Sequence, residues 1–489
     1  MLKPTLEEAK KLREDYKVIP VALEMMSDIR TPIEVLKILK TLSPHCYILE
    51  SVERQEKWGR YTFLGFAPKM CITCINGTIK VNNLEEKSES VYKDCNPAQF
   101  IRNLLKDYTS PKFPDFPTFT GGLVGYFSYD YIKYSEPCLK LDAKDDDGFY
   151  DMDLMLFDKV IAFDNMKQKL YLIENIRTKH LEKDYEKVEK SLKELKELLI
   201  RGTEVELPKT KLKSEFKPLF NQQEFCTMVE KAKNYIYEGD IFQVVLSNRL
   251  EAEFEGSLLD TYRVLRTLNP SPYMFYFSGD DIEVAGASPE TLVKLENGVL
   301  HTFPLAGTKP RGKDEREDKE LERQLLADEK ECAEHNMLVD LGRNDLGKIS
   351  SFGSVSVEKY MSIERYSHVM HIGSTVRGEI AEGYSAIDAI DAVLPAGTLS
   401  GAPKIRACEI INELEDNKRG IYGGAVGYID FTGNLDTCIA IRLAFAKNGK
   451  VFVRSGAGIV ADSIPENEYR ECIHKAAAVM KALEMAGEV

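Results

Sequence analysis

Short runs of alternating hydrophobic and polar positions dominate the first 170 residues and predict β-strands. The runs RYTFLGF, MCITCI and GGLVGYFSYD are rich in β-branched and aromatic residues and are separated by turn residues. Asn76-Gly77 follows MCITCI directly, which predicts a tight turn there. A strongly charged segment at about 180–200 then repeats Leu192, Leu195 and Leu199 at helical spacing, so we expect a helix.

The pattern changes beyond residue 220, where longer helices and glycine-rich strands are predicted. The preceding segment 201–218, RGTEVELPKTKLKSEFKP, is polar and poor in apolar residues, as linkers are. QQEFCTMVEKAKNYIYEGD predicts a helix that ends at Gly239, and AIDAIDAVLPAGTLSGAPKIRACEIINELE predicts two helices around a glycine-rich loop. Strands with a hairpin turn at Asn448-Gly449 follow. We predict an α+β fold of antiparallel sheets covered by helices, with domains at 1–207 and 218–489.

Length, charge and cysteine usage exclude several classes of protein. A chain of 489 residues is longer than a typical domain with a single hydrophobic core. Its net charge of −14 argues against nucleic acid and anionic membranes as partners. No apolar run approaches the roughly 20 residues that span a bilayer, and the first residues lack a signal-peptide core, so we expect a cytoplasmic protein. Cys71 and Cys74 form a CxxC pair without a second pair at zinc-site spacing, so we interpret them as strand residues.

Two pairs of glutamates stand three residues apart in predicted helices. DEKECAEHNMLVDLGRNDLGKIS contains Glu331 and Glu334, and NEYRECIHKAAAVM contains Glu468 and Glu471, with Lys475 one turn later. Residues at this spacing share a helix face, where two carboxylates repel each other unless a cation lies between them. A solvated acidic face is the alternative interpretation. Carboxylates suit Mg²⁺, so two pairs on separate helices can bind this ion jointly.

Other segments add groups suited to a small anionic ligand. YSHVMHIGSTVRGE contains His368 and His371, and its alternation predicts a strand, on which these two histidines lie on opposite faces. One of them can therefore face a given pocket. Backbone N–H groups beside small residues and a guanidinium can hold a carboxylate, and the glycine-rich segments offer Thr398, Lys404, Tyr422, Arg442 and the turn 456–458. Together these groups predict a pocket for a polyanion, with a histidine for proton transfer.

The order of these segments resembles that of the chorismate-utilising enzymes. The matching motifs cover residues from about 220 to 480 and are GASPETLVKL, PLAGTKPRG, EHNMLVDLGRNDL, HVMH, PAGTLSGAPK, YGGAVGY, RSGAGIV and EYREC. LESVE and RYTFLG resemble the N-terminal half of anthranilate synthase large subunits. The resemblance implies a two-domain α/β sandwich that binds chorismate between the sheets of its larger domain. It also implies a lyase that makes anthranilate and pyruvate from chorismate and ammonia, in tryptophan biosynthesis.

The resemblance implies roles for individual residues. Glu334 and Glu471 match the Mg²⁺ ligands, His371 matches the proton-transfer residue, and Thr398 falls at a further catalytic position. The implied substrate-binding residues are Gly307, Thr308, Tyr422, Arg442, Gly456, Ala457, Gly458 and Lys475.

Two positions separate the activities of this family. The resemblance implies that aminodeoxychorismate synthases have a nucleophilic lysine where this chain has Ala306, and that isochorismate synthases have a water-activating lysine at Gln243. Alanine is no nucleophile and glutamine is no base, so both positions favour anthranilate synthase. Component I of an aminodeoxychorismate synthase is one alternative. A non-catalytic tryptophan sensor is the other, although such a protein does not need Glu334, Glu471 and His371.

A partner and an effector follow from the same resemblance. None of the ten cysteines has the glycine-flanked setting of a glutaminase nucleophile, so we expect a separate glutamine amidotransferase subunit in a hetero-oligomer. ILES resembles a tryptophan-binding signature, which implies inhibition by L-tryptophan at a site formed by Ser51, Pro272, Tyr273 and Met274. Cys438 matches another family position linked to inhibition.

Overall fold

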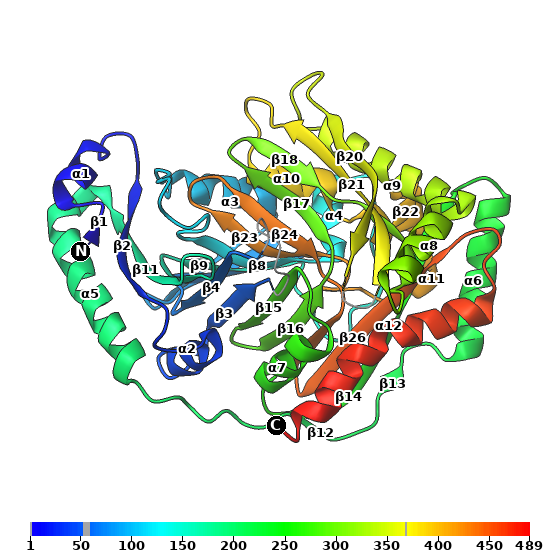
Figure 1. Ribbon diagram of the computed structural model, residues 1–489, viewed down its shortest axis with the longest axis horizontal. Coiled ribbons are helices and arrows are strands. Elements are labelled where there is room, and N and C mark those ends of the chain that lie inside the picture. Colours follow the sequence, from blue (N-terminus) through cyan, green and yellow to red (C-terminus); the bar gives the residue numbers. More distant parts are fainter. Residues whose placement is uncertain (1, 52–58, 367–368) are drawn as a thin grey trace.

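Two large antiparallel sheets form the protein, which the computed structural model describes over residues 2–51, 59–366 and 369–489 (Figure 1). The first sheet follows the order β1 (Leu2–Lys3), β2 (Val18–Met26), β11 (Lys169–Arg177), β10 (Lys159–Asp164), β4 (Tyr61–Phe66), β3 (Cys46–Glu50), β15 (Tyr273–Ser278), β16 (Ile282–Ser288), β25 (Leu443–Lys447), β26 (Lys450–Ile459), β14 (Gln243–Glu255) and β12 (Lys211–Leu212). β13 (Lys217–Pro218) and β22 (Gly401–Ala402) also pair with β14.

The second sheet faces the first. Its order is β19 (Leu305–Pro310), β21 (Val369–Glu379), β18 (Val299–Thr302), β17 (Thr291–Glu296), β24 (Leu435–Ile439), β23 (Ala425–Asp430), β8 (Gly122–Phe127), β9 (Met152–Phe157), β5 (Met70–Ile75), β6 (Thr78–Asn83) and β7 (Ser88–Tyr92). β20 (Ser356–Arg365) pairs with β21 beside this path.

Helices cover the outer faces of both sheets (Figure 1). One apolar core joins the first sheet to α1 (Leu6–Lys11), α2 (Pro32–Leu39), α5 (Leu181–Arg201), α7 (Leu259–Leu268) and α12 (Pro465–Ala486). A second core joins the second sheet to α3 (Pro97–Lys106), α9 (Glu329–Gly347) and α10 (Ala386–Val393). α6 (Gln222–Tyr237) and α11 (Lys404–Glu415) pack on β14 and β26, α8 (Glu315–Leu326) packs on β21, and the short α4 (Ile132–Ser135) follows β8.

The space between the two sheets is filled mainly by aromatic side chains. Tyr47 of the first sheet and Phe157 of the second meet edge to face, with ring centroids 4.7 Å apart. Phe63 and Tyr428 pair in the same way at 6.0 Å. Such pairs add roughly 0.5–1.5 kcal/mol beyond the area they bury, so this aromatic layer holds the two sheets together.

Both sheets contain strands from each side of the predicted boundary at 207–218. β3 pairs with β15 in the first sheet, and β8 pairs with β23 in the second. Backbone hydrogen bonds therefore continue from the N-terminal part of the chain into the C-terminal part. The division into 1–207 and 218–489 stays a prediction. Part of the predicted linker forms β12 and β13 at the edge of β14.

The local predictions from the sequence are confirmed at several elements. α5 buries Leu192, Leu195 and Leu199 on one face. Asn448 and Gly449 have φ of 53° and 73° and form the turn between β25 and β26, a left-handed backbone that suits this residue pair. The α+β architecture of antiparallel sheets covered by helices is confirmed as well.

Candidate active site

A cavity of about 580 Å³ lies where β19, β21 and α9 approach β14, β26 and α12. Among the residues that line it are Gly307, Thr308, Glu334, His371, Thr398, Tyr422, Arg442, Gly456, Gly458, Glu471 and Lys475. These residues were predicted as site residues from widely separated segments of the sequence. The fold brings them together around one space.

His371 projects from β21 into this cavity. Its Nδ1 lies 2.8 Å from the carbonyl oxygen of Gly307 and 3.1 Å from Oγ1 of Thr308. A carbonyl oxygen only accepts hydrogen bonds, so Nδ1 carries the proton and Nε2 keeps a free lone pair. Burial lowers the pKa of His371, which the Gly307 hydrogen bond opposes and the nearby Arg442 charge reinforces. The ring is therefore neutral at pH 7 and can act as a base.

Gly307 has a backbone conformation that makes this contact possible. Its φ is 66°, in the left-handed region that side chains disfavour. A Cβ at this position would lie 3.1 Å from Oε2 of Glu331, which also lines the cavity. Glycine thus allows the chain to turn close to both His371 and the acidic groups.

Four carboxylates reach the cavity from two helices. α9 begins after Asp328, whose side chain accepts hydrogen bonds from the N–H groups of Lys330 and Glu331. Glu331 and Glu334 then lie one turn apart, and Glu468 and Glu471 lie on α12 in the same way. All four line the cavity.

The charges of these carboxylates are partly uncompensated. Burial raises the pKa of Glu331, and the Glu334 charge adds to this effect. Burial likewise raises the pKa of Glu468, with a contribution from the Glu471 charge. Glu471 pairs with Lys475 at 2.7 Å, and Glu334 accepts a hydrogen bond from Nε2 of Gln243 at 3.2 Å. Crowded oxygen ligands of this kind suit a hard divalent cation such as Mg²⁺.

Another part of the cavity wall offers hydrogen-bond donors and small residues. Arg442 lines the cavity, and its Nη1 donates to Asn269 at 3.4 Å. A Cβ on Gly456 would lie 3.0 Å from the hydroxyl of Tyr422, and a Cβ on Gly458 would lie 2.7 Å from Nε2 of Gln243. Larger residues at these two positions would fill the wall. A carboxylate can therefore approach the backbone of β26 beside a guanidinium.

Glu290 is a site residue that the sequence reasoning missed. It lines the cavity directly before β17 and accepts a hydrogen bond from Oγ1 of Thr398 at 3.1 Å. Burial raises the pKa of Glu290 to about 7. A carboxyl group that is partly protonated at neutral pH can act as a proton donor. The available signal was its place within the motif GASPETLVKL.

Two candidates do not join the cavity wall, and a third cannot be placed. The prediction for Lys404 was wrong, because its Nζ is buried against Asp345 at 2.7 Å and the carbonyl of Val393 at 2.9 Å. Ala457 lies between two wall glycines, but its side chain packs into the core behind β26. His368 lies outside the described residues.

A separate cavity of about 270 Å³ lies between the two sheets, at the ends of β3 and β15. Ser51, Pro272, Tyr273 and Met274 all line it, together with Cys438. Ser51 Oγ is buried and has no hydrogen-bond partner among the described residues. This cavity therefore contains every residue that the resemblance implied for an effector site.

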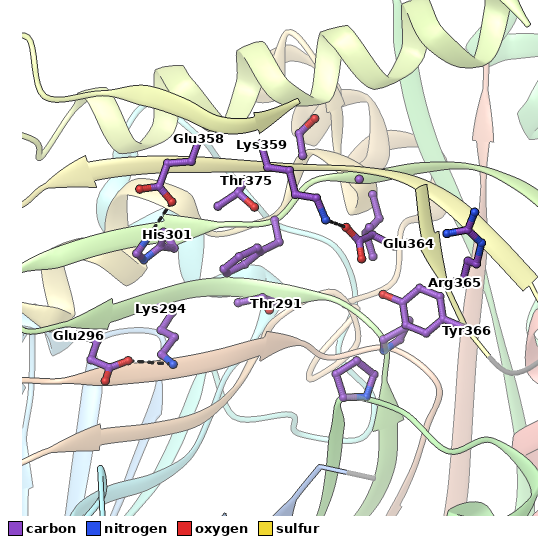
Figure 2. A pocket seen from close by; sticks show the side chains of 16 residues that line it. Thr291, Lys294, Glu296, His301, Glu358, Lys359, Glu364, Arg365, Tyr366 and Thr375 are labelled. Atoms are coloured by element: carbon purple, nitrogen blue, oxygen red, sulfur yellow. Dashed lines mark hydrogen bonds and ion pairs between the residues drawn. The ribbon is translucent and has the colours of Figure 1, made fainter. Parts of the chain in front are cut away.

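A third cavity, of about 650 Å³, lies between β17, β18, β20 and β21 (Figure 2). Its wall is strongly charged, with Lys294 paired to Glu296 at 3.0 Å and His301 facing Glu358 at 3.6 Å (Figure 2). It shares Pro272, Lys294 and Glu296 with the effector cavity, and it shares Pro289 and Leu305 with the active-site cavity. The three cavities are therefore neighbours in space.

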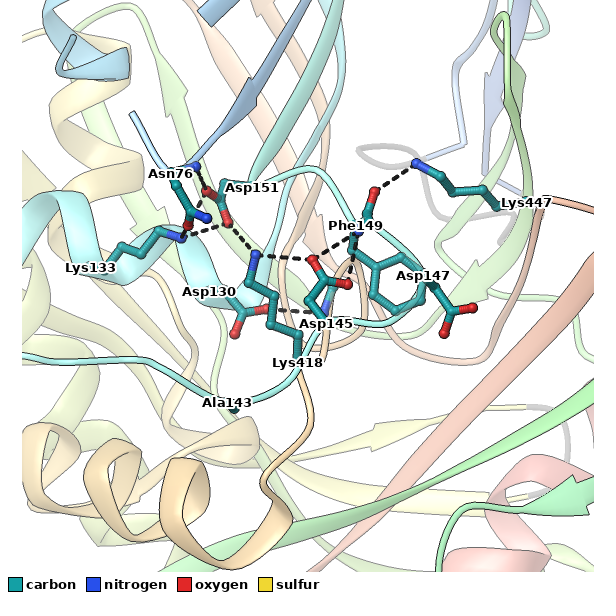
Figure 3. Close-up of polar contacts among 12 residues, drawn as sticks. Asn76, Asp130, Lys133, Ala143, Asp145, Asp147, Phe149, Asp151, Lys418 and Lys447 are labelled. Atoms are coloured by element: carbon teal, nitrogen blue, oxygen red, sulfur yellow. Dashed lines mark hydrogen bonds and ion pairs between the residues drawn. The ribbon is translucent and has the colours of Figure 1, made fainter. Parts of the chain in front are cut away.

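A buried lysine fixes the turn that leads to Tyr422. Lys418 Nζ lies 3.2 Å from the carboxylate of Asp145 and 3.4 Å from that of Asp151 (Figure 3). Asp130 accepts a hydrogen bond from the N–H of Gly420 at 3.0 Å. These acids belong to the N-terminal part of the chain. Because a buried charge without its partner is costly, the N-terminal part helps to hold this wall of the site in place.

A buried ion network anchors the glycine-rich strand β26. Arg454 Nη2 lies 2.8 Å from Glu415, which also binds Arg419 at 2.6 Å. Arg454 Nε donates to Ser247 of β14 at 2.8 Å. Burial alone would raise the pKa of Glu415, but the two guanidinium groups outweigh burial and lower it. The carboxylate is therefore ionised, and it fixes β26 next to β14.

The fold is that of the chorismate-utilising enzymes. Residues 44–481 match the model of the chorismate binding enzyme family, and this chain belongs to that family. Within the described ranges, no helix combines the length and apolar character that crossing a membrane requires.

The chain is also similar over its full length to particular members of the family. Anthranilate synthase component 1 of Acetivibrio thermocellus is 46% identical over 497 residues, covering 100% of both chains. The Aquifex aeolicus protein of the same name is 46% identical over 491 residues, covering 99% of this chain and 98% of that one. The crystal structure of anthranilate synthase component I from Streptococcus pneumoniae superposes with a TM-score of 0.77, at 39% identity, over 93% of this chain and 98% of that chain.

Proposed function

We propose that this chain is component 1 of an anthranilate synthase and converts chorismate and ammonia to anthranilate and pyruvate in the cytoplasm. The observation that carries the proposal is one cavity in which Ala306 and Gln243 lie beside His371 and four carboxylates. Neither residue has an amine that can attack the ring or activate water. Ammonia can therefore be the nucleophile. The names of the relatives support the same reaction.

Glu334 and Glu471 are the residues that we propose to bind Mg²⁺. Their carboxylates line the same cavity from α9 and α12. Burial, with a contribution from the neighbouring glutamate charge, raises the pKa of Glu331 and of Glu468, and a cation would favour the ionised forms. Bound Mg²⁺ supplies positive charge next to the ring carboxylate of the substrate and favours electron withdrawal from the ring. Arg442, Tyr422 and the backbone of 456–458 are placed to bind the second carboxylate, on the enolpyruvyl group.

Two groups divide the proton transfers in this proposal. Glu290, with its pKa near 7, donates a proton to the hydroxyl at C4, which leaves as water while ammonia attacks C2. The nitrogen then loses a proton to solvent. His371, neutral and with its Nε2 lone pair available, takes the remaining proton from C2 as the ring becomes aromatic and the enolpyruvyl group leaves as the enolate of pyruvate. A proton from solvent then converts this enolate to pyruvate.

Ammonia reaches the site, in this proposal, from a separate glutamine amidotransferase subunit. L-Tryptophan would bind in the cavity that contains Ser51 and Met274. The third cavity adjoins both this cavity and the active-site cavity and shares wall residues with each. Movement of these shared residues would therefore change the shape of both neighbouring cavities. An effector acts in this way if it binds one arrangement of the two sites better than the other.

The direct test is the purified chain with chorismate, MgCl₂ and a large excess of ammonium chloride near pH 7, where Glu290 still carries its proton in part of the molecules. We expect anthranilate, detected by its fluorescence and by chromatography, and an equal amount of pyruvate. The reaction should stop when Mg²⁺ is chelated. Formation of isochorismate or of a 4-amino product in place of anthranilate would contradict the proposal.

A further inference from the structure

Three side chains with different metal-binding atoms converge at one edge of the space between the sheets. His45 directly precedes β3, Asp280 lies in the turn between β15 and β16, and Cys71 lies on β5. Their candidate ligand atoms all lie within 4.8 Å of one another. His45 and Asp280 belong to the first sheet and Cys71 to the second, so the cluster bridges the two sheets.

The His45 imidazole is the buried nitrogen ligand of this cluster, and its contact with Asp280 is close but is not a hydrogen bond. Its side chain is 6% exposed, and Nε2 lies 2.8 Å from Oδ1 of Asp280. The two groups do not meet hydrogen-bond geometry, so Nε2 is buried without a hydrogen-bond partner among the described residues. A buried polar atom in this state costs free energy unless something binds it. The ligand atom of His45 lies within 4.8 Å of those of Cys71 and Asp280.

Cys71 faces the cluster, whereas the other cysteine of the CxxC pair does not. Cys71 packs in the core between the sheets, and Cys74 packs in the core on the outer side of β5. Cys74 Sγ lies 3.5 Å from the hydroxyl of Tyr134. Residues three apart on a strand point to opposite faces, so the two thiols cannot bind one ion. The interpretation that the pair itself forms no metal site agrees with this geometry.

The residues around the His45, Cys71 and Asp280 cluster carry more negative than positive charge. Asp281 pairs with Lys447 at 3.2 Å and accepts a hydrogen bond from Tyr150 at 3.0 Å. Asp153 is half-buried on β9, where the charges of Asp281 and Asp280 act on it. The Asp280 side chain itself is 62% exposed. A cation at the cluster would therefore lie in a favourable field and still be reached from solvent.

We propose that His45, Cys71 and Asp280 bind a thiophilic divalent cation, with Zn²⁺ as the best match. A nitrogen, a sulfur and an oxygen ligand suit Zn²⁺, whereas the thiolate disfavours Mg²⁺ and Ca²⁺. Tetrahedral bonds of about 2.0–2.3 Å place ligand atoms roughly 3.3–3.8 Å apart. His45 Nε2 and Asp280 Oδ1, now 2.8 Å apart, must therefore separate slightly, while the widest separation in the cluster must shorten by up to about 1 Å. Movement of the exposed Asp280 turn can supply this closure. Water takes the fourth position, and the thiol proton leaves to solvent as the metal–sulfur bond forms.

A bound ion would link the start of β3 and the β15–β16 turn to β5. The site is distinct from the active-site cavity, because none of the described residues that line that cavity is a cysteine. The proposal therefore does not depend on the catalytic function of the chain.

The test uses Co²⁺ as a spectroscopic probe of thiolate ligation, on full-length protein freed of metal with a chelator. We expect one equivalent of Co²⁺ to give a sulfur-to-metal charge-transfer band in the near ultraviolet, and Zn²⁺ to abolish this band by displacement. Cys71→Ala should lose the band and weaken Zn²⁺ binding by at least about tenfold. Cys74→Ala is the matched control, since it removes a buried cysteine from the other face of the same strand. It should keep both properties.

His45→Gln is the second variant, because it leaves every cysteine in place and should weaken the band and the Zn²⁺ affinity in the same way. Zn²⁺ should also raise the Tm of the parent and of Cys74→Ala, without raising that of His45→Gln. A parent protein without a charge-transfer band would overturn the proposal and leave His45 and Asp280 as an ordinary ion pair. A band that persists in Cys71→Ala or disappears in Cys74→Ala would overturn it as well.

Discussion

His371 Nδ1 lies 2.8 Å from the carbonyl oxygen of Gly307. This contact fixes the tautomer of the ring and orients Nε2 for proton transfer. It also explains why a glycine with φ of 66° precedes Thr308, since the turn brings the carbonyl to the histidine. The proposed chemistry depends on this pair.

His371→Ala should keep the fold and lower turnover by roughly 10²–10⁴-fold, which is the usual contribution of a general base. The measurement is the initial rate of anthranilate formation with ammonium as the nitrogen source. His180→Ala is the control, because His180 is exposed in the short helical turn Thr178–His180 and lines none of the three cavities described above. Near-normal turnover in His371→Ala would remove this histidine from the mechanism.

The pH profile should reflect two groups with opposite protonation requirements. Burial lowers the pKa of His371 below 6.5, so kcat/KM should fall only as the pH drops through this lower value and the base becomes protonated. Burial raises the pKa of Glu290 to about 7, so kcat/KM should fall again as the pH rises above about 7 and the acid loses its proton.

Glu290→Gln tests the alkaline part of this profile. Glutamine keeps the shape of the side chain and has no acidic proton, so activity should drop and the alkaline limb should disappear. An unchanged alkaline limb in this variant would assign that limb to another group. The profile has to be recorded at saturating ammonia, because the concentration of free ammonia itself rises with pH.

Glu334→Gln should raise the Mg²⁺ concentration needed for half-maximal activity by about tenfold or more, since it replaces an anionic ligand by a neutral one. The measurement is activity against free Mg²⁺ at saturating chorismate. Glu329→Gln is the matched control, because Glu329 lies on the same helix but does not line the cavity. Identical Mg²⁺ titrations for both variants would leave the acids without a role in metal binding.

Ser51→Phe should make the enzyme insensitive to tryptophan while turnover of chorismate stays within about twofold. The phenyl ring would fill a cavity of about 270 Å³ that lies apart from the catalytic residues. Ser90→Phe, on the exposed strand β7, controls for the change in side-chain chemistry. Tryptophan inhibition at the parental concentration in Ser51→Phe would disprove the assignment of the effector site.

Local features of this fold could be predicted from the sequence because they depend on neighbours along the chain. Spacing placed Glu331 and Glu334 on one helix and Glu468 and Glu471 on another, and both helices are present. The pairing of β3 with β15 could not be predicted in this way, since the two strands lie more than 200 residues apart in the sequence. A local pattern predicts a strand but does not show which distant strand it pairs with.

The candidate site shows the same limit. A lysine beside a glycine-rich loop looks available for an anion, but Lys404 pairs with a buried Asp345 that the local sequence does not reveal. Glu290 was missed because it has no second acid at helical spacing, so nothing in the local sequence distinguishes it from other single acidic residues. Its importance depends on burial and on its contact with Thr398, and both come from the tertiary structure.

The central claim is that ammonia attacks chorismate directly in a cavity that lacks a nucleophilic side chain at position 306. Ala306 lies on β19 and lines this cavity beside Gly307 and Thr308. A lysine there would occupy the approach to C2, and an amine desolvated in the cavity can lose its proton and become nucleophilic. The decisive measurement compares the parent with Ala306→Lys by anthranilate fluorescence and intact-protein mass, after incubation with chorismate, Mg²⁺ and ammonium. We predict that the parent makes anthranilate, whereas the variant loses this activity and part of it gains mass as a covalent adduct. Anthranilate formation at the parental rate in Ala306→Lys would contradict the account.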